Sequence, residues 1–202
     1  NWKKKKIAIF ISGRGSNMIA LINDMKNGKD HPGQPELVVS DNINADGLTF
    51  AKQNSVETFS LDVKKDEDKT VFEERTLSIL KKNNIEVICL AGFMRILSQN
   101  FINTFSKPIM NIHPSLLPSF KGLNTHERVL KAGCLIHGAT IHLITKKLDE
   151  GPILGQAVIK IPDDSTPQEL KEQLLSQEHL LYTEVLREFL KGSGRKILTT
   201  SF

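Results

Sequence analysis

An α/β fold is predicted by the order of apolar segments along this chain of 202 residues. Short β-rich runs alternate with stretches in which apolar residues recur every three or four positions, and these two periods are typical of strands and helices. The first run occupies residues 6–12 and ends at Gly13, and a helical stripe follows it at Met18, Leu21, Ile22 and Met25. Because strands that alternate with helices are joined by right-handed crossovers, the pattern predicts a Rossmann-like, mostly parallel twisted sheet flanked by helices.

The other elements are predicted from the same two periods and from turn residues. Further strands are expected at residues 36–40, 57–61, 86–91, 108–111, 137–145 and 153–161. Helices are expected at residues 17–26 and 46–54, from the charged residues 64–69 to about residue 83, and from Pro167 onward. Residues 113–125 contain two prolines and a glycine with little periodicity, which predicts a long loop of a kind that is often functional. The tail from Gly192 is expected to be frayed, and the whole chain is expected to form one domain with two lobes.

Composition and charge narrow the class of function. A content of 39% hydrophobic and 25% charged residues is typical of a globular domain, and no apolar run approaches the roughly 20 residues of a membrane span. The net charge of +4 favours anionic small molecules, whereas one Trp, one Tyr and no basic segment interleaved with aromatics argue against a nucleic-acid partner. Two cysteines exclude a disulfide scaffold and a four-cysteine zinc site, and a reducing cytoplasm is the simplest location.

A glycine loop, residues 12–17, joins the first strand to the first helix. Gly13 and Gly15 let the backbone approach a ligand, and the helix N-terminus offers N–H groups and a positive dipole end that suit a phosphate. Met18 stands where the dinucleotide fingerprint needs a third glycine, and no Walker lysine follows, so a small phosphorylated substrate is favoured over NAD or ATP. The alternative is a plain turn in which Ser16 or Asn17 caps the helix.

Residues 91–97 directly follow a buried strand and contain apolar side chains beyond its end. These residues suit a pocket for a flat heterocycle whose edge is read by backbone groups. The alternative is that they pack against the edge of the sheet.

Asn111 and His113 point the same way if the strand before them continues, because side chains alternate along a strand. An amide that donates to a developing oxyanion and an imidazole that moves a proton would then face one point. The alternative for His113 is a buried histidine bonded to a backbone carbonyl. The other histidines, His31, His126, His137, His142 and His179, are expected to be structural or on the surface.

Two carboxylates complete the candidate site. Asp149 precedes Gly151-Pro152, which is usual in turns, but a carboxylate there could also raise the pKa of an imidazole and steer a proton. Glu178 falls in the apolar stripe of the last helix, between Leu174 and Leu181, so it either lies near an edge or meets a cation or hydroxyl donors.

Three of these segments follow predicted parallel strands, and open α/β sheets bind ligands at that edge. The chain contains no HExxH, CxxC or Gly-x-Ser-x-Gly motif, so neither a metal site nor a serine hydrolase is expected.

Taken together, the motifs resemble those of the phosphoribosylglycinamide formyltransferase family, which belongs to the folate-dependent formyltransferases. The matching segments, in order along residues 5–190, are residues 11–17, 91–97, 111–118, 148–152 and 177–179. The resemblance implies the formyltransferase fold, with an N-terminal phosphate-binding lobe over about residues 5–105 and a C-terminal folate and catalytic lobe over about residues 106–190.

The resemblance also implies a role for each matching residue. The catalytic residues would be Asn111, His113 and Asp149. Glycinamide ribonucleotide would be held by Gly15, Ser16, Asn17 and Glu178. The co-substrate 10-formyltetrahydrofolate would be held by Lys69, Met94, Arg95, Ile96, Leu97 and Asn111.

The implied reaction is formyl transfer to the amine of glycinamide ribonucleotide in purine biosynthesis, by a monomer or homodimer without metal, nucleic acid or membrane. Three alternatives stay open: a formyltetrahydrofolate hydrolase, a methionyl-tRNA formyltransferase, and a nucleotide-binding module without catalysis. The first two usually carry an extra domain for which this sequence has no room, and the third does not require Asn111, His113 and Asp149 together.

Overall fold

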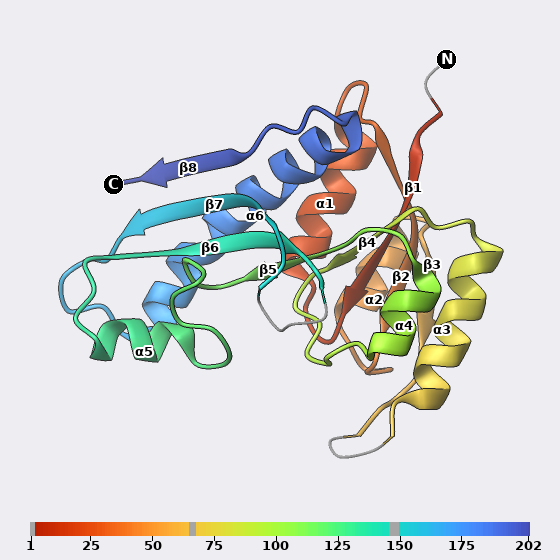
Figure 1. Ribbon diagram of the computed structural model, residues 1–202, viewed down its shortest axis with the longest axis horizontal. Helices are drawn as coiled ribbons and strands as arrows, with labels where there is room; N and C mark the ends of the chain where they lie inside the picture. The colour runs from red at the N-terminus through yellow and green to blue at the C-terminus, as the bar shows by residue number, and fades with distance from the viewer. Residues whose placement is uncertain (1–2, 65–67, 146–149) are drawn as a thin grey trace. The chain divides into compact units, whose positions relative to one another are not determined.

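The computed structural model describes residues 3–64, 68–145 and 150–202. The chain forms two compact units, Asn1–Met110 and Asn111–Phe202, which are described in turn. Figure 1 follows the chain from the N-terminus in red to the C-terminus in blue.

The first unit is built on four parallel strands. They are β1 (Lys5–Ile11), β2 (Gly33–Ser40), β3 (Glu57–Ser60) and β4 (Val87–Leu90), and their order is β3-β2-β1-β4. The last five residues of β1 and all of β4 are buried. Burial on both faces is the reason that these strands are continuous apolar runs rather than alternating ones.

Helices cover both faces of these strands. They are α1 (Ser16–Asn27), α2 (Gly47–Gln53), α3 (Thr70–Lys82) and α4 (Gln99–Phe105). The helices contact one another in two pairs, α1 with α2 and α3 with α4, and Figure 1 shows α1 and α3 on opposite sides of the strands. The right-handed crossover explains this division, because the chain moves from β1 to β2 to β3 in one direction and then returns past β1 to β4.

The strand β5 (Ile109–His113) leads the chain from the first unit into the second. The second unit contains β6 (Ile136–Leu143), β7 (Ile153–Lys160), β8 (Ile197–Ser201), α5 (Thr125–Lys131) and α6 (Pro167–Lys191). The strands β6 and β7 are antiparallel, whereas β7 and β8 are parallel. The long helix α6 buries its apolar stripe against all three strands.

The α/β class and the mostly parallel sheet are confirmed, but several element boundaries were wrong. The strand β2 begins at Gly33 rather than at residue 36. The helix α4 was not predicted, although Ser98 caps it by accepting a hydrogen bond from the N–H of Phe101 at 3.1 Å. The helix α5 was not predicted either, because only Thr125 and Val129 of its seven residues are buried and the apolar signal is weak.

The expectation of a frayed tail was also wrong. Residues Ile197–Ser201 pair with β7 as β8, and Ile197 is buried. The five-residue run is rich in β-branched side chains, but a short run acquires a strand partner only through tertiary folding. Among residues 3–64, 68–145 and 150–202, no helix has both the length and the apolar character needed to cross a membrane.

Candidate functional site

The glycine loop follows β1 and ends in a helix terminus that no side chain caps. Gly15 adopts φ +69°, and a Cβ there would lie 3.2 Å from Cε of Met18, so the position favours glycine. The helix α1 then begins at Ser16 with no acidic residue in its first turn. Such a terminus suits an anion. The helix begins one residue earlier than predicted, and its N-cap residue is Gly15 rather than Ser16 or Asn17.

The predicted folate segment, residues 94–97, lies beside this loop in the first unit. The main-chain N–H of Met94 donates a hydrogen bond of 2.9 Å to Oγ of Ser12. The ammonium of Lys69, at the start of α3, donates to the carbonyl oxygen of Ile96. The structure thus brings Lys69 to the segment to which the sequence interpretation assigned it.

The side chains of the folate segment divide between solvent and core. Met94 and Ile96 are 70% and 64% exposed, whereas Leu97 is buried. Exposed apolar side chains at the carboxyl end of a parallel strand are available to a flat ring, which favours the ligand interpretation over packing at the sheet edge. The Arg95 side chain points elsewhere, because its Nε donates to Oδ2 of Asp41 at 3.1 Å.

Ser12 and Asp41 are residues of this edge that sequence reasoning missed. The Ser12 hydroxyl donates to Oδ1 of Asp41 at 2.7 Å, and Asp41 is buried directly after β2. A polar residue immediately after a buried parallel strand is the signal that would have identified Asp41.

In the second unit, Asn111 and His113 lie two positions apart on β5, so their side chains share a face of the strand. Asn111 is half-buried and His113 is buried. The Nε2 atom of His113 lies 3.0 Å from the carbonyl oxygen of Phe120. A carbonyl only accepts, so Nε2 carries the proton in this contact. The contact is the one expected of a structural histidine, and it also fixes the ring orientation that a catalytic histidine needs.

The loop after His113 is anchored at several points within the second unit. The Ser115 hydroxyl donates to the Ser119 carbonyl at 2.7 Å, and the Thr125 hydroxyl donates to the Pro114 carbonyl at 2.6 Å. Lys121 forms an ion pair of 2.8 Å with Glu150. These contacts give the long loop a defined path, although it has no regular secondary structure until α5.

Of the two predicted carboxylates, Glu178 belongs to the described residues and Asp149 does not. Glu178 is 6% exposed on α6, among the buried residues of the apolar stripe. This burial argues against the solvent-exposed edge position and for a site where a carboxylate meets a donor or a cation.

The remaining histidines have structural surroundings in their own units. His31 is buried and accepts from the N–H of Gly33 through Nδ1 at 2.9 Å. His126 Nδ1 lies 3.0 Å from His137 Nε2, and burial together with the nearby His126 and His113 lowers the pKa of His137 to about 4. Burial also lowers the pKa of His126 and of His179.

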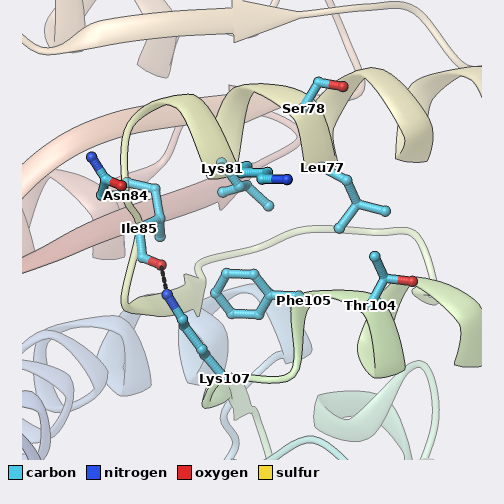
Figure 2. A pocket seen from close by; sticks show the side chains of 9 residues that line it. Leu77, Ser78, Lys81, Asn84, Ile85, Thr104, Phe105 and Lys107 are labelled. Atoms are coloured by element: carbon cyan, nitrogen blue, oxygen red, sulfur yellow. Dashed lines mark hydrogen bonds between the residues drawn. The ribbon is translucent and has the colours of Figure 1, made fainter.

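One pocket in each unit is lined by residues other than the predicted site residues. A pocket of about 340 Å³ lies between the second halves of α3 and α4, next to the residues that precede β4. Figure 2 shows Leu77 and Phe105 against it and Lys107 donating to the Ile85 carbonyl at 3.3 Å. This is the amino end of β4, the edge opposite the glycine loop. Within the described part of the chain, no three His, Cys, Asp or Glu side chains are grouped to hold a metal ion.

Comparison with known proteins shows which family the chain is similar to. A family model described as formyl transferase matches residues 5–186. The trifunctional purine biosynthetic protein adenosine-3 of Gallus gallus is 38% identical over 94% of this chain, which spans only 19% of that protein. The phosphoribosylglycinamide formyltransferase of Bacillus subtilis is 32% identical over 95% of this chain and 97% of its own length.

Solved structures extend the similarity to three dimensions. The phosphoribosylglycinamide formyltransferase from Brucella melitensis is 42% identical, with a TM-score of 0.87 over 93% of this chain and 96% of its own. The one from Anaplasma phagocytophilum is 32% identical, with a TM-score of 0.89 over 99% of this chain and all of its own.

Proposed function

The chain belongs to the formyl transferase family, and from this premise we propose that it transfers the formyl group of 10-formyltetrahydrofolate to the amine of glycinamide ribonucleotide. The products are formylglycinamide ribonucleotide and tetrahydrofolate, in purine biosynthesis. Relatives of similar length that carry the name phosphoribosylglycinamide formyltransferase support this substrate pair.

One structural observation carries the proposal furthest. The glycine loop, which leads into the N-terminus of α1 that suits a phosphate, is hydrogen-bonded through Ser12 to the exposed apolar segment that suits a flat ring. A phosphorylated substrate and a heterocyclic co-substrate therefore have adjacent binding segments within one unit. We assign the ribose phosphate to Gly15, Ser16 and Asn17.

The folate is assigned to Lys69 and to residues 94–97, with Asn111 contributing from β5. The backbone groups of residues 95–97 would read the edge of the ring, because the Arg95 guanidinium is engaged with Asp41. Glu178 is assigned to the glycinamide end of the other substrate, where a buried carboxylate meets an amine. This assignment differs from the two lobes expected from the sequence, because Lys69 and residues 94–97 belong to the first unit and Glu178 belongs to the second.

The catalytic step needs charge stabilisation and one proton transfer. The amine attacks the formyl carbon, and the negative charge that develops on the formyl oxygen is stabilised by the Asn111 amide and by protonated His113. Asp149 keeps His113 charged and orients a proton-carrying water, so that the amine loses a proton as the folate nitrogen gains one and leaves. Holding both substrates together supplies up to about 7–11 kcal/mol of the barrier in the best-oriented cases.

The acceptor distinguishes this proposal from its rivals. We expect purified protein to formylate glycinamide ribonucleotide and to leave both water and methionyl-tRNA unreacted. The assay follows loss of 10-formyltetrahydrofolate spectroscopically, with each acceptor offered alone. Faster consumption with water alone or with charged tRNA would contradict the proposal. The protein is proposed to act in the cytoplasm as a monomer or homodimer.

A further inference from the structure

Three strand-end segments of the first unit meet at Ser12 and Asp41. The Ser12 hydroxyl donates to Oδ1 of Asp41 at 2.7 Å and accepts from the N–H of Met94 at 2.9 Å. The other carboxylate oxygen of Asp41, Oδ2, accepts from Nε of Arg95 at 3.1 Å. A continuous chain of hydrogen bonds therefore runs from the glycine loop, through the residue after β2, to the segment after β4.

Asp41 is buried, so its carboxylate requires a charged partner, and Arg95 is that partner. The side chain of Asp41 is 6% exposed and that of Arg95 is 25% exposed. The Arg95 guanidinium also donates to the carbonyl oxygen of Val63, and the N–H of Val63 donates to the carbonyl oxygen of Asp41 at 3.0 Å. A carboxylate removed from water is costly unless it is paired, and Arg95 provides the paired charge for Asp41. The contacts with Asp41 and with the Val63 carbonyl hold the arginine side chain at two points.

The glycine loop is fixed from its other side as well. The side-chain amide of Asn42 donates to the Ser12 carbonyl at 3.2 Å, and the N–H of Gly47 donates to the Gly13 carbonyl at 3.1 Å. A displacement of the loop at Ser12 therefore requires that hydrogen bonds to Asp41, Asn42 and Met94 change together. The position of residues 94–97 thus depends on that of residues 12–17.

We propose that Ser12 and Asp41 are positioning residues that couple the two substrates: occupation of the glycine loop by a phosphate strengthens binding of the folate at residues 94–97. This inference rests on the proposed assignment of those two segments. Neither residue needs to touch the reacting atoms, because each acts through the backbone of Met94 and the side chain of Arg95.

The physical cause of the coupling is the shared cost of ordering. A ligand that fixes one loop removes conformational freedom from the hydrogen-bonded neighbour, so the second ligand loses less entropy when it binds. The coupling is reciprocal, and couplings of this kind usually change affinity about five-fold or more.

The test measures the affinity of tetrahydrofolate, the unreactive product, by calorimetry with and without saturating glycinamide ribonucleotide. The ratio of the two dissociation constants is the coupling factor. We expect a factor of about five or more in the wild-type protein. We expect it to fall toward one in Asp41→Asn, which loses the ion pair with Arg95, and in Ser12→Ala, which loses the hydroxyl bonded to Met94.

Asp62→Asn is the matched control. Asp62 is exposed, follows β3 on the same edge, and accepts from the N–H of Ile43 at 2.8 Å, without a contact to Ser12 or Arg95 among the hydrogen bonds of the described chain. Its coupling factor should equal that of the wild type. Because the factor is a ratio within one variant, a general loss of stability that weakens both measurements equally leaves it unchanged.

Two results would overturn the inference: a wild-type factor of one, or wild-type factors in both variants. If Ser12→Ala does not fold, Asp41→Asn alone decides, since it keeps the volume of the side chain. Formyl transfer to glycinamide ribonucleotide by the wild-type protein is measured in parallel. Absence of that transfer would overturn the proposed function, whereas transfer without coupling would overturn only the role of Ser12 and Asp41.

Discussion

His137 is almost completely buried in β6, and its Nε2 lies 3.0 Å from Nδ1 of His126. At least one of two hydrogen-bonded imidazoles must be neutral, and burial disfavours the charged form of both. The pKa of His137 is accordingly lowered to about 4, and that of His126 is lowered by burial and by the charge of Lys171. His113 on the neighbouring segment is tied to a backbone carbonyl instead. In this unit His137 thus contributes to the folded structure, whereas His113 on our proposal takes part in catalysis.

The buried pair predicts acid sensitivity. Folded His137 has a pKa of about 4 and the unfolded chain about 6.5, so the unfolded state binds the proton more tightly between these values. The contribution to stability is present above pH 6.5 and is lost as the pH falls toward 4, with a magnitude of about 1–3 kcal/mol. His137→Gln should flatten this part of the pH dependence. Urea unfolding at pH 7, 5.5 and 4.5 measures it, and identical slopes in both proteins would argue against the assignment.

The proposed catalytic role of His113 predicts a loss of turnover when its imidazole is removed. His113→Ala should lower kcat by about 100-fold to 10,000-fold, because a positioned proton-transfer group contributes that much. The KM for both substrates should change only a few-fold, since the folate and phosphate segments lie elsewhere in the chain. Steady-state formyl transfer measures both constants, and thermal unfolding shows whether the variant is folded. An unchanged kcat with a raised KM would show that His113 binds rather than reacts.

At the scale of elements, Ser98 joins the start of α4 to α3 by hydrogen bonds. Ser98 accepts from the N–H of Phe101 as the N-cap of α4, and it donates to Oε1 of Glu73 on α3 at 2.6 Å. The N–H of Ser98 donates to the other carboxylate oxygen of Glu73 at 2.8 Å. Glu73 is buried, so this cap also supplies hydrogen bonds to a carboxylate that water does not reach freely.

Ser98→Ala should therefore cost more than an ordinary cap. We expect a loss of about 2–4 kcal/mol in the free energy of unfolding, from the missing cap and from one hydrogen bond removed from buried Glu73. Thr166→Ala, at the exposed N-cap of α6, is the control and should cost about 0.5–2 kcal/mol. Equal losses in the two variants, measured by urea unfolding, would show that the Ser98 hydroxyl does not stabilise buried Glu73.

At the scale of the whole molecule, each of the two units has its own core and its own strands. The residues predicted to act on one reaction fall in both units, with Gly15 and residues 94–97 in the first and with His113 and Glu178 in the second. Any ligand that binds the folded protein but not the unfolded chain raises the stability of the fold it binds. Ligand-linked stability is therefore a property of the whole chain that tests the substrate assignment without turnover.

Glycinamide ribonucleotide at 100 times its dissociation constant should add about 2.7 kcal/mol to the free energy of unfolding. Ribose 5-phosphate should stabilise less, because it lacks the amine end assigned to Glu178, and NAD should have no effect. Thermal or urea unfolding in the presence of each ligand measures this. Stabilisation by NAD at or above that of glycinamide ribonucleotide would contradict the interpretation of the glycine loop.

Much of this protein could be read from local patterns. The period of apolar residues determined the strands of the first unit and the helix stripes, because burial on one or both faces leaves a mark on neighbouring positions. The glycine loop was also identifiable from the sequence, because the positive φ at Gly15 is a requirement of the local backbone. The elements α4, α5 and β8 escaped, because each buries only one or two residues and so leaves a weak apolar pattern in the sequence.

The sequence by itself determined the fold class, and it predicted a phosphate loop and the types of reacting group, all from residues close together in the chain. Only the tertiary structure decided that Ser12, Asp41 and Arg95 form one hydrogen-bonded network, that His137 is paired and neutral, and that the tail adds a strand. The physical reason is that hydrogen bonds and burial act through space. Ser12 lies 29 residues from Asp41, and Asp41 lies 54 from Arg95, so no local pattern records their meeting.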